Sequence, residues 1–321
     1  MAEIPQTPIV TLTMNPALDV STSVARMVPF TKMRCAQAHR DPGGGGINVA
    51  RVLKRLGVEA TAVYPAGGAT GQLLANLIER EGVRSVVIPA TNDTREDITI
   101  FDETTREQFR LVFPGAPLND IEWRDCLGSM TRITPQPAYI IASGSVPAGV
   151  PHDFFGRVAQ ASKAHSKIIV DTSGPFLRAA LEAGVYLIKP NLREFQELAE
   201  FAAIDEASLV DAGRRLIDRY RIEVIALSMG SDGALLVTRD MALRANGLPI
   251  DPISVSGAGD SFLGAMVWSL VKGNSLEIAL RYGVAGGSAA LLNPGTELCR
   301  PDDVHRLASQ VIVTPIARTT R

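Results

Sequence analysis

Short apolar runs alternate with longer amphipathic stretches along most of the 321-residue chain. Runs of this kind, bounded by turn residues, are typical of strands buried on both faces, and apolar positions repeating every three or four residues indicate helices. The alternation predicts an α/β fold in which helices cover both faces of a parallel sheet. The expected strands are Ile9–Met14, Ala60–Tyr64, Ala138–Ala142, Ile168–Asp171, Tyr186–Ile188 and Val224–Leu227, and the expected helices are Ile47–Leu56, Gln72–Glu81, Phe154–Ala164, Pro175–Glu182, Arg193–Phe201 and Ser208–Tyr220.

Two insertions, at about residues 20–41 and 94–114, interrupt this alternation. The first contains two candidate strands, Ser21–Met27 and Met33–Arg40, and the second contains Asp97–Asp102 and Gln108–Phe113, joined by a polar hairpin connection. We interpret the four as a small β-sheet that folds over one edge of a single domain spanning residues 1–321. They are also compatible with extra edge strands of the main sheet.

Composition narrows the class of protein. A net charge of −2 and a pI near 6.1 give no basis for binding nucleic acid or a membrane surface. The N-terminus lacks the pattern of a signal peptide, and no apolar run approaches the roughly 20 residues that cross a bilayer. Three widely separated cysteines suggest reduced thiols in a cytoplasmic protein, and the four scattered histidines do not predict a zinc site.

The segment Val255–Phe262 is a glycine turn that ends in an acid and continues into an apolar stretch. We expect a buried helix to begin near Gly257, with free backbone N–H groups suited to a phosphate or an oxyanion. Asp260 places a carboxylate beside those donors, as a kinase requires for the proton of its acceptor hydroxyl. An ordinary helix cap is the alternative interpretation of the same residues.

Four consecutive glycines, from Gly43 to Gly46, precede the expected helix at Ile47–Leu56. Such a run is entropically costly unless something approaches the backbone closely. A polyhydroxylated ligand held by N–H groups and by the Asn48 amide explains it better than a nucleotide fingerprint, and a flexible hinge is the alternative. Asp19 follows the first strand and can accept hydrogen bonds from sugar hydroxyls, although a carboxylate in a turn has the same pattern.

Other polar residues follow the later strands. Asn191 and Glu194 have the spacing of a helix cap, which is compatible with a place beside a hydrated Mg²⁺. The turn from Ser228 to Gly233 suits either a nucleotide or a simple hairpin. Ser145 lies in a further strand-end loop, and Arg95 has the chemistry to pair with a phosphate or to remain solvated.

Together these segments resemble the ribokinase-like (PfkB) family of carbohydrate kinases, from about Ile9 to about Ala308. The matching pieces, in family order, are the Gly43–Asn48 segment, the Asn191/Glu194 pair and the Gly257–Asp260 signature. Within the family, the chain is more closely similar to the second, minor type of bacterial 6-phosphofructokinases. That similarity is carried by residues 42–51, 65–71, 113–116 and 287–290, leading to Asn293 and Gly295-Thr296.

The resemblance implies a ribokinase-like sandwich with a small lid, and it implies roles for individual residues. Asp260 would be the base, with N–H groups from Gly257, Ala258 and Gly259 as the anion hole. The sugar would contact Asp19, Gly43, Gly44, Asn48 and Ser145, and its phosphate would contact Arg95. The ATP site would include Lys189, Asn191, Ser228, Gly230, Gly233, Ser254, Ser256 and Ser288, with Lys32 at a lid position that meets nucleotide; Glu194 would organise Mg²⁺ through water, and Ser254, Ser256, Ala290, Asn293 and Gly295 would surround K⁺.

The implied activity is ATP-dependent phosphorylation of a hexose monophosphate, with fructose 6-phosphate as the expected substrate and a homodimer formed through the lid. The segment Asn15–Asp19 resembles 1-phosphofructokinases and tagatose-6-phosphate kinases as much as it resembles 6-phosphofructokinases, whereas Gly45 favours 6-phosphofructokinases. Ser254-Val255 stands where many family members carry Asp-Thr in the K⁺ loop. A sensor that binds sugar phosphate and nucleotide without transfer is the alternative from another class. Because Asp260 lies beside a helix start, we expect its pKa to be low.

Overall fold

The computed structural model describes residues 8–200 and 205–317. Within them, a large sheet of ten strands has the order β14-β13-β12-β11-β10-β9-β8-β1-β4-β5. The strands from β11 to β5 are parallel to their neighbours, and β12, β13 and β14 add an antiparallel edge. The bounds are β1 Ile9–Leu12, β4 Thr61–Ala66, β5 Arg84–Pro89, β8 Tyr139–Ser143, β9 Lys167–Asp171, β10 Leu187–Ile188, β11 Val224–Ser228, β12 Gly233–Val237, β13 Ala242–Asn246 and β14 Val313–Pro315.

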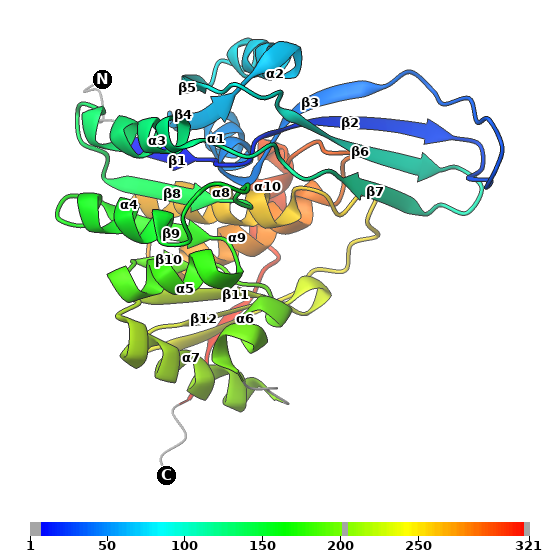
Figure 1. Ribbon diagram of the computed structural model, residues 1–321. Coiled ribbons are helices and arrows are strands. Elements are labelled where there is room, and N and C mark those ends of the chain that lie inside the picture. Colours follow the sequence, from blue (N-terminus) through cyan, green and yellow to red (C-terminus); the bar gives the residue numbers. More distant parts are fainter. Residues whose placement is uncertain (1–7, 201–204, 318–321) are drawn as a thin grey trace, which may run out of the picture.

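Helices cover both faces of this sheet (Figure 1). Successive residues of a strand point to opposite faces, so Ile9 belongs to one hydrophobic core and Val10 to the other. The first core contains residues of α1 Gly45–Arg55, α2 Gly68–Arg80, α8 Ala258–Val271, α9 Leu276–Ala290 and α10 Pro301–Ala308. The second contains residues of α3 Asp120–Arg132, α4 Phe154–Ser162, α5 Gly174–Ala183, α6 Leu192–Ala199 and α7 Glu206–Tyr220.

Helix α8 is buried on nearly every side, between α1 and α9. Small residues permit this close packing: a Cβ on Gly264 would lie 2.6 Å from a methyl carbon of Val52, and one on Gly286 would lie 2.6 Å from Ala265 Cβ. Larger side chains here would force the helices apart. The packing therefore fixes the direction of α8, whose first turn lies at the edge where the parallel strands end.

A second, four-stranded sheet has the order β3-β2-β6-β7 and extends to one side of the main body (Figure 1). Its strands are β2 Ala17–Val24, β3 His39–Gly43, β6 Arg95–Asp102 and β7 Gln108–Val112. The pair β2/β6 is parallel, whereas β2/β3 and β6/β7 are antiparallel. The two predicted insertions thus combine into one separate sheet rather than adding to the main one.

The predicted mixed α/β fold is confirmed, with local errors. The expected strand Met33–Arg40 is wrong: β3 begins at His39, and only an isolated bridge joins Cys35 to Val24 before it. The predicted Ser21–Met27 strand instead begins at Ala17 and ends at Val24. The end of the expected helix Arg193–Phe201 lies outside the described residues.

The three cysteines are free, with Cys126 and Cys299 buried and Cys35 exposed. In the described part of the chain, the helices are too short or too polar to cross a membrane.

Candidate active site

Asp260 lies in the first turn of α8, and its carboxylate does not cap that helix. The N-cap is Gly257, with φ 73° and no side-chain capping hydrogen bond. Instead, Asp260 Oδ2 accepts a hydrogen bond of 2.8 Å from Nδ2 of Asn48 in α1. The capping interpretation of Asp260 is therefore wrong, and two motifs 212 residues apart in the sequence meet directly.

The expected low pKa of Asp260 is also wrong. Burial, the largest cause, raises its pKa to about 6, and nearby Asp171 raises it further; the Asn48 hydrogen bond and the charges of Lys189 and Arg110 oppose this rise. Desolvation outweighs the favourable helix start that the sequence suggested. A carboxyl group with this pKa is mostly ionised at neutral pH, yet it is more basic than an exposed aspartate.

Lys189 lies at the edge of the sheet just after β10 and is 6% exposed. Its Nζ is 3.2 Å from Asp171 Oδ1 at the end of β9, and a Cβ on Gly259 would lie 3.5 Å from the same nitrogen. Burial disfavours the charged ammonium, but Asp171, Asp260 and Glu194 outweigh it and raise the pKa of Lys189. A permanent positive charge thus lies against the first turn of α8.

The glycine run is not a hinge, because each of its members packs against a neighbouring segment. A Cβ on Gly43 would lie 2.5 Å from the Asp19 carboxyl carbon, and one on Gly44 would lie 2.7 Å from a carbon of Thr13. A Cβ on Gly45 would collide with the Ser143 hydroxyl, and one on Gly46 would lie 2.6 Å from Thr13 Oγ1. Atoms of the protein itself therefore already lie close to each of these glycines.

Asp19 belongs to a row of carboxylates across the small sheet, opposite Asp41 on β3 and Asp97 on β6. Burial and then Asp97 raise its pKa to about 7, opposed by Arg110, Arg51 and Arg95. Arg95 lies on β6, and its Nη1 donates to both carboxylate oxygens of Asp97, at 2.7 and 2.8 Å. Arg95 is thus not simply solvated, although its Nε has no hydrogen-bond partner within residues 8–200 and 205–317.

Arg95 also connects the small sheet to the main body. Its Nη2 donates to the carbonyl of Asn15 at 3.3 Å, and Asn15 Nδ2 donates to Ser145 Oγ at 3.0 Å. The predicted sugar-contacting residues therefore surround one region, between the polar face of the small sheet, the glycine run and the start of α8.

Lys189, Asn191 and Ser228, three of the predicted nucleotide-side residues, lie at or just after adjoining strand ends. Asn191 and Glu194 form a complete capping box on α6, as their spacing predicted. An isolated β-bridge joins Asn191 to Ser228. Ser228 is followed by a short 3-10 helix at Gly230–Asp232 and then by β12, which is antiparallel to β11. The hairpin interpretation of the turn from Ser228 to Gly233 is therefore confirmed. Ser288 lies in α9, and the adjacent Gly287 approaches Ala258: a Cβ on Gly287 would lie 3.3 Å from Ala258 O.

The residues predicted around K⁺ form one compact loop cluster. Ser254 Oγ donates to the Gly295 carbonyl at 2.5 Å and accepts from the Ser256 backbone N–H at 3.2 Å. The Asn293 N–H donates to the Ala290 carbonyl at 3.2 Å. Among the described residues, Ser256 Oγ is buried without a hydrogen-bond partner.

Lys32 is set apart from the other predicted residues. It is exposed in the connection between β2 and β3, which forms the far end of the small sheet (Figure 1). Within one chain, it is not brought to Asp260.

Three residues near this region were not predicted from sequence. Asp171 ends β9 and pairs with Lys189. The charge of Arg110 on β7 lowers the pKa of both Asp19 and Asp260. The side chain of Thr13 accepts a hydrogen bond of 2.8 Å from the Ile47 backbone N–H. Asp171 and Thr13 lie at strand ends, where the position alone is a signal. Arg110 lies two residues from both Gln108 and Val112 in β7, and this spacing places the three on one face of the small sheet.

Comparison with known proteins explains this arrangement. The model of the pfkB family carbohydrate kinases matches residues 9–303. The chain belongs to this family. As a pfkB family member, it is an ATP-dependent sugar-phosphate kinase.

The relatives of this pfkB kinase include two named ATP-dependent 6-phosphofructokinase isozyme 2. The protein from Mycobacterium tuberculosis H37Rv is 44% identical over 93% of this chain and 88% of its own length, and that from Escherichia coli K12 is 38% identical over 93% and 97%. The structure of E. coli phosphofructokinase-2 in complex with potassium has a TM-score of 0.90 and 37% identity, covering 95% of this chain and 99% of that one. Another structure of the same enzyme contains fructose 6-phosphate.

Relatives with lower identity have different substrate names. They include a 1-phosphofructokinase from Borreliella burgdorferi, 31% identical, and a D-tagatose-1-phosphate kinase from Bacillus licheniformis, 32% identical. The family membership therefore establishes a sugar-phosphate kinase and leaves the exact sugar to the site.

Proposed function

We propose that this kinase phosphorylates O1 of fructose 6-phosphate to give fructose 1,6-bisphosphate. The observation that carries the proposal is the direct contact between Asn48 and Asp260, which joins the glycine-run segment to the first turn of α8. The names of the two relatives with 44% and 38% identity support this sugar.

In the proposed reaction, the sugar hydroxyl loses its proton to Asp260 as its oxygen bonds to the terminal phosphorus of ATP. The bond from that phosphorus to the bridging oxygen breaks, and ADP leaves. The N–H groups of Gly257, Ala258 and Gly259 face the migrating group at the positive end of α8. Lys189 adds a fixed positive charge beside Gly259. Most of the acceleration would come from positioning and charge neutralisation.

On the sugar side, Asp19, Gly43, Gly44, Asn48 and Ser145 hold the hydroxyl groups in this proposal, and Arg95 holds the existing phosphate. Asp97 keeps Arg95 in place through two short contacts. A phosphate at the wrong end of the sugar would not reach Arg95, which makes this residue the basis of substrate discrimination.

On the nucleotide side, we propose contacts from Lys189, Asn191, Ser254, Ser256 and Ser288, with the turn at Ser228, Gly230 and Gly233 beneath the nucleotide. Mg²⁺ would neutralise charge on the ATP phosphates. In residues 8–200 and 205–317, His, Cys, Asp and Glu do not form a group of three able to hold a metal ion. Glu194, whose charge also acts on Lys189 and Asp171, therefore suits contact through water.

K⁺ is proposed at the cluster formed by Ser254, Ser256, Ala290, Asn293 and Gly295. The unpartnered Ser256 Oγ is an oxygen of the type that K⁺ coordinates. The potassium complex of E. coli phosphofructokinase-2 supports K⁺ binding by a kinase of this type. The chemistry supplied by K⁺ there would be electrostatic support of the loop that precedes α8.

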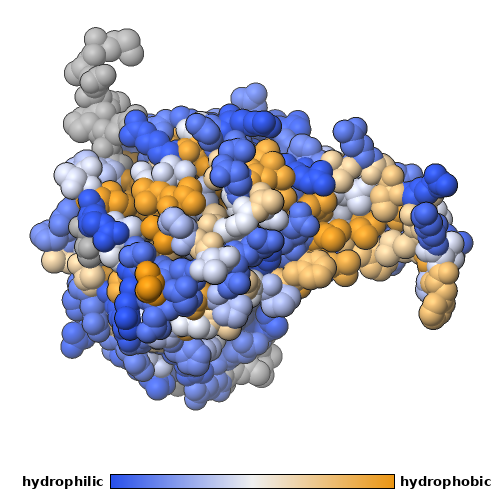
Figure 2. Space-filling model, turned by 45° about the horizontal axis from the view of Figure 1, so that its top comes forward, coloured by the Kyte–Doolittle hydropathy of each residue, from blue (hydrophilic) through white to orange (hydrophobic). Residues whose placement is uncertain are grey.

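The small sheet is proposed to be a lid of a single kinase domain and the contact of a homodimer. One face carries Asp19, Asp41 and Asp97, while the opposite face pairs Ile98 with Leu111 and Ile100 with Phe109. Apolar residues along this protruding sheet are visible at the surface in Figure 2. Covering them with a second copy would bring the partner's lid to the site, and this would place the exposed Lys32 near the nucleotide.

The test is ADP release with a panel of sugars, with and without a phosphate. Fructose 6-phosphate should give the highest kcat/KM, and tagatose 6-phosphate and fructose 1-phosphate should be poorer substrates. A preference for fructose 1-phosphate would contradict the proposed sugar. Binding of sugar phosphate and ATP without ADP release would indicate the sensor alternative.

A further inference from the structure

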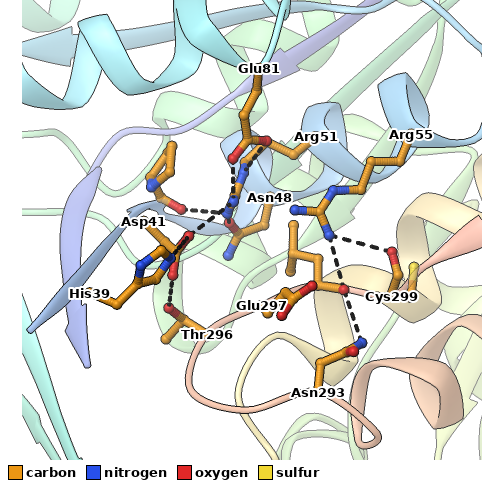
Figure 3. Close-up of polar contacts among 12 residues, drawn as sticks. His39, Asp41, Asn48, Arg51, Arg55, Glu81, Asn293, Thr296, Glu297 and Cys299 are labelled. Carbon is orange, nitrogen blue, oxygen red and sulfur yellow. Dashed lines mark hydrogen bonds and ion pairs between the residues drawn. The ribbon is translucent and has the colours of Figure 1, made fainter. Parts of the chain in front are cut away.

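Arg51 is a charged side chain in the interior of the protein, one turn after Asn48 on α1 and 1% exposed. Its guanidinium uses all three nitrogens (Figure 3). Nε and Nη2 donate to the two carboxylate oxygens of Glu81 at 2.8 and 2.6 Å. Nη1 donates to the Pro42 carbonyl at 2.7 Å and to Asn48 Oδ1 at 3.2 Å.

The Asn48 amide lies between Arg51 and Asp260, and its two ends have opposite chemistry. Its oxygen accepts from Arg51, and its nitrogen donates to Asp260. An amide rotated by half a turn would place its oxygen against the Asp260 carboxylate and its NH₂ group against the guanidinium, so both contacts would become repulsive. Arg51 therefore selects one of the two amide orientations.

We propose that Arg51 is a positioning residue, which holds the Asn48 amide in the orientation that donates to Asp260. The inference rests on the proposed function, because it assigns Arg51 a role in the step that Asp260 performs. Arg51 does not itself touch Asp260, so it acts through Asn48.

The surroundings of Arg51 hold its guanidinium in place. Glu81 compensates its charge, and Asp41 Oδ1 on the small sheet is 3.6 Å from Nη2. Asp41 in turn accepts a 3.0 Å hydrogen bond from Thr296 (Figure 3). A buried charge with this many partners is held in one geometry, because each lost contact leaves a desolvated group unpaired.

A lysine at this position would keep the charge and lose the geometry. Its single nitrogen, when paired with Glu81, is not also at the Nη1 position that contacts Pro42 and Asn48. Arg51→Lys therefore removes the Asn48 contact while retaining the ion pair. Arg55→Lys is the matched control, because Arg55 lies one turn further along α1 and donates to the carbonyls of Leu298 and Cys299 at 3.0 and 3.5 Å.

The charged groups that face Asp260 come from three other elements: Asp171 at the end of β9, Lys189 after β10 and Arg110 on β7. None of them changes in Arg51→Lys. The Asn48 hydrogen bond lowers the pKa of Asp260, so its loss should move the acidic limb of the kcat–pH profile upward. The direct charge effect of Arg51 falls on Asp19, and lysine preserves it.

The experiment compares wild type, Arg51→Lys, Arg55→Lys, Asn48→Ala and the Arg51→Lys/Asn48→Ala double variant at saturating sugar phosphate and ATP. Arg51→Lys should lower kcat by roughly five- to tenfold, the size of one lost side-chain hydrogen bond, and raise the acidic limb. In the Asn48→Ala background, the same substitution should lower kcat by less than about twofold, because the residue through which it acts is gone. Arg55→Lys should leave the limb unmoved.

The inference is overturned if Arg51→Lys and Arg55→Lys have the same pH profile, or if the effects of Arg51→Lys and Asn48→Ala on kcat multiply. Should Arg51→Lys fail to fold, Glu81→Gln loosens the same guanidinium and should lower kcat only when Asn48 is present.

A second readout does not require turnover. The side-chain NH₂ signal of Asn48 in the full-length protein, assigned by its loss in Asn48→Ala, should titrate with Asp260 in wild type and shift its midpoint in Arg51→Lys. Absence of turnover in wild type with this titration intact would contradict the proposed function alone, whereas an unchanged midpoint would contradict the role of Arg51.

Discussion

The first turn of α8 and the small sheet hold their polar groups in different ways. At α8, Asp260 and Lys189 contact residues of the main body, and the helix itself is packed tightly between α1 and α9. On the small sheet, Asp19, Asp41 and Asp97 line one face, while the other face keeps apolar side chains at the surface. The difference indicates that the polar groups at α8 are preorganised by the main body, whereas those of the small sheet lie on a part of the molecule that also has an exposed apolar face.

The largest effect is expected at the preorganised centre. Asp260→Asn keeps the size of the side chain and removes the proton acceptor, so kcat should fall by roughly 10²-fold or more, as in other losses of general-base catalysis. The KM values for sugar phosphate and ATP should change little. Steady-state assays decide this, with Asp251→Asn on an exposed loop as the control. Near-normal turnover in Asp260→Asn would remove Asp260 from the reaction.

The pH dependence of turnover follows from the same carboxylate. Because burial raises the pKa of Asp260 to about 6, and the ionised form accepts the proton, kcat should fall about tenfold per unit below pH 6. A profile of kcat against pH, with a thermal scan at each pH to exclude unfolding, measures it. A limb near pH 4 would show that bound substrates or Mg²⁺ restore the ordinary acidity of Asp260.

The glycine run tests how closely the start of α1 packs against the end of β8. Gly45→Ala places a methyl group against Ser143 and Gly144, so we expect a loss of about 1–3 kcal/mol in the free energy of unfolding, the usual cost of overpacking. Gly57→Ala, at the end of the same helix, has no heavy atom within 4 Å of the new Cβ and meets only the cost of its positive φ of 78°. Denaturant unfolding compares them. Equal losses would mean that the glycine run tolerates side chains.

Asp19 should lower the stability of the small sheet at neutral pH. Its pKa rises on folding from 3.8 to about 7, so the folded state binds more protons and the free energy of unfolding decreases as pH rises through this window. Asp19→Asn removes the effect and should raise Tm by a few degrees at pH 8, but not at pH 4. The same variant should raise the KM for the sugar phosphate. An identical Tm difference at both pH values would assign the change to packing.

The smallest effect on folding is expected at the apolar face of the small sheet. Leu111 is 48% exposed, so Leu111→Lys should change the free energy of unfolding of one chain by less than about 0.5 kcal/mol. It should nevertheless dissociate the proposed dimer, because a charge would be buried in its contact. Sedimentation velocity measures this, with exposed Glu107→Lys in the β6–β7 connection as control. A dimer that survives Leu111→Lys would place the contact elsewhere.

The sequence predicted the layers of the fold better than its edges. Runs such as Ile168–Asp171 are apolar on both faces and unambiguous, whereas β3 carries His39, Arg40 and Asp41 and has no apolar pattern. Residues near Met33 offered that pattern without forming a strand, whereas Asp41 of β3 has partners in Thr296 and Arg51. These long-range contacts are absent from any local window of sequence.

The site could be predicted as a set of motifs, but not as a set of interactions. The Asn191/Glu194 capping box depends on three-residue spacing, so it was predictable. The pairing of Lys189 with Asp171 and the burial that raises the pKa of Asp260 depend on which strand ends are adjacent. Burial in particular has no local signal, and for this reason the expected acidity of Asp260 was wrong.

The tetraglycine segment has a consequence for how sequences of this kind are compared. Its missing side chains make room for a carboxylate, two hydroxyls and a strand end of the same molecule, before any ligand arrives. A chain that shares the segment therefore shares this internal fit, whichever sugar it accepts. Differences in sugar choice should be sought among residues that line the space left open. The number of glycines reflects the internal packing of the fold.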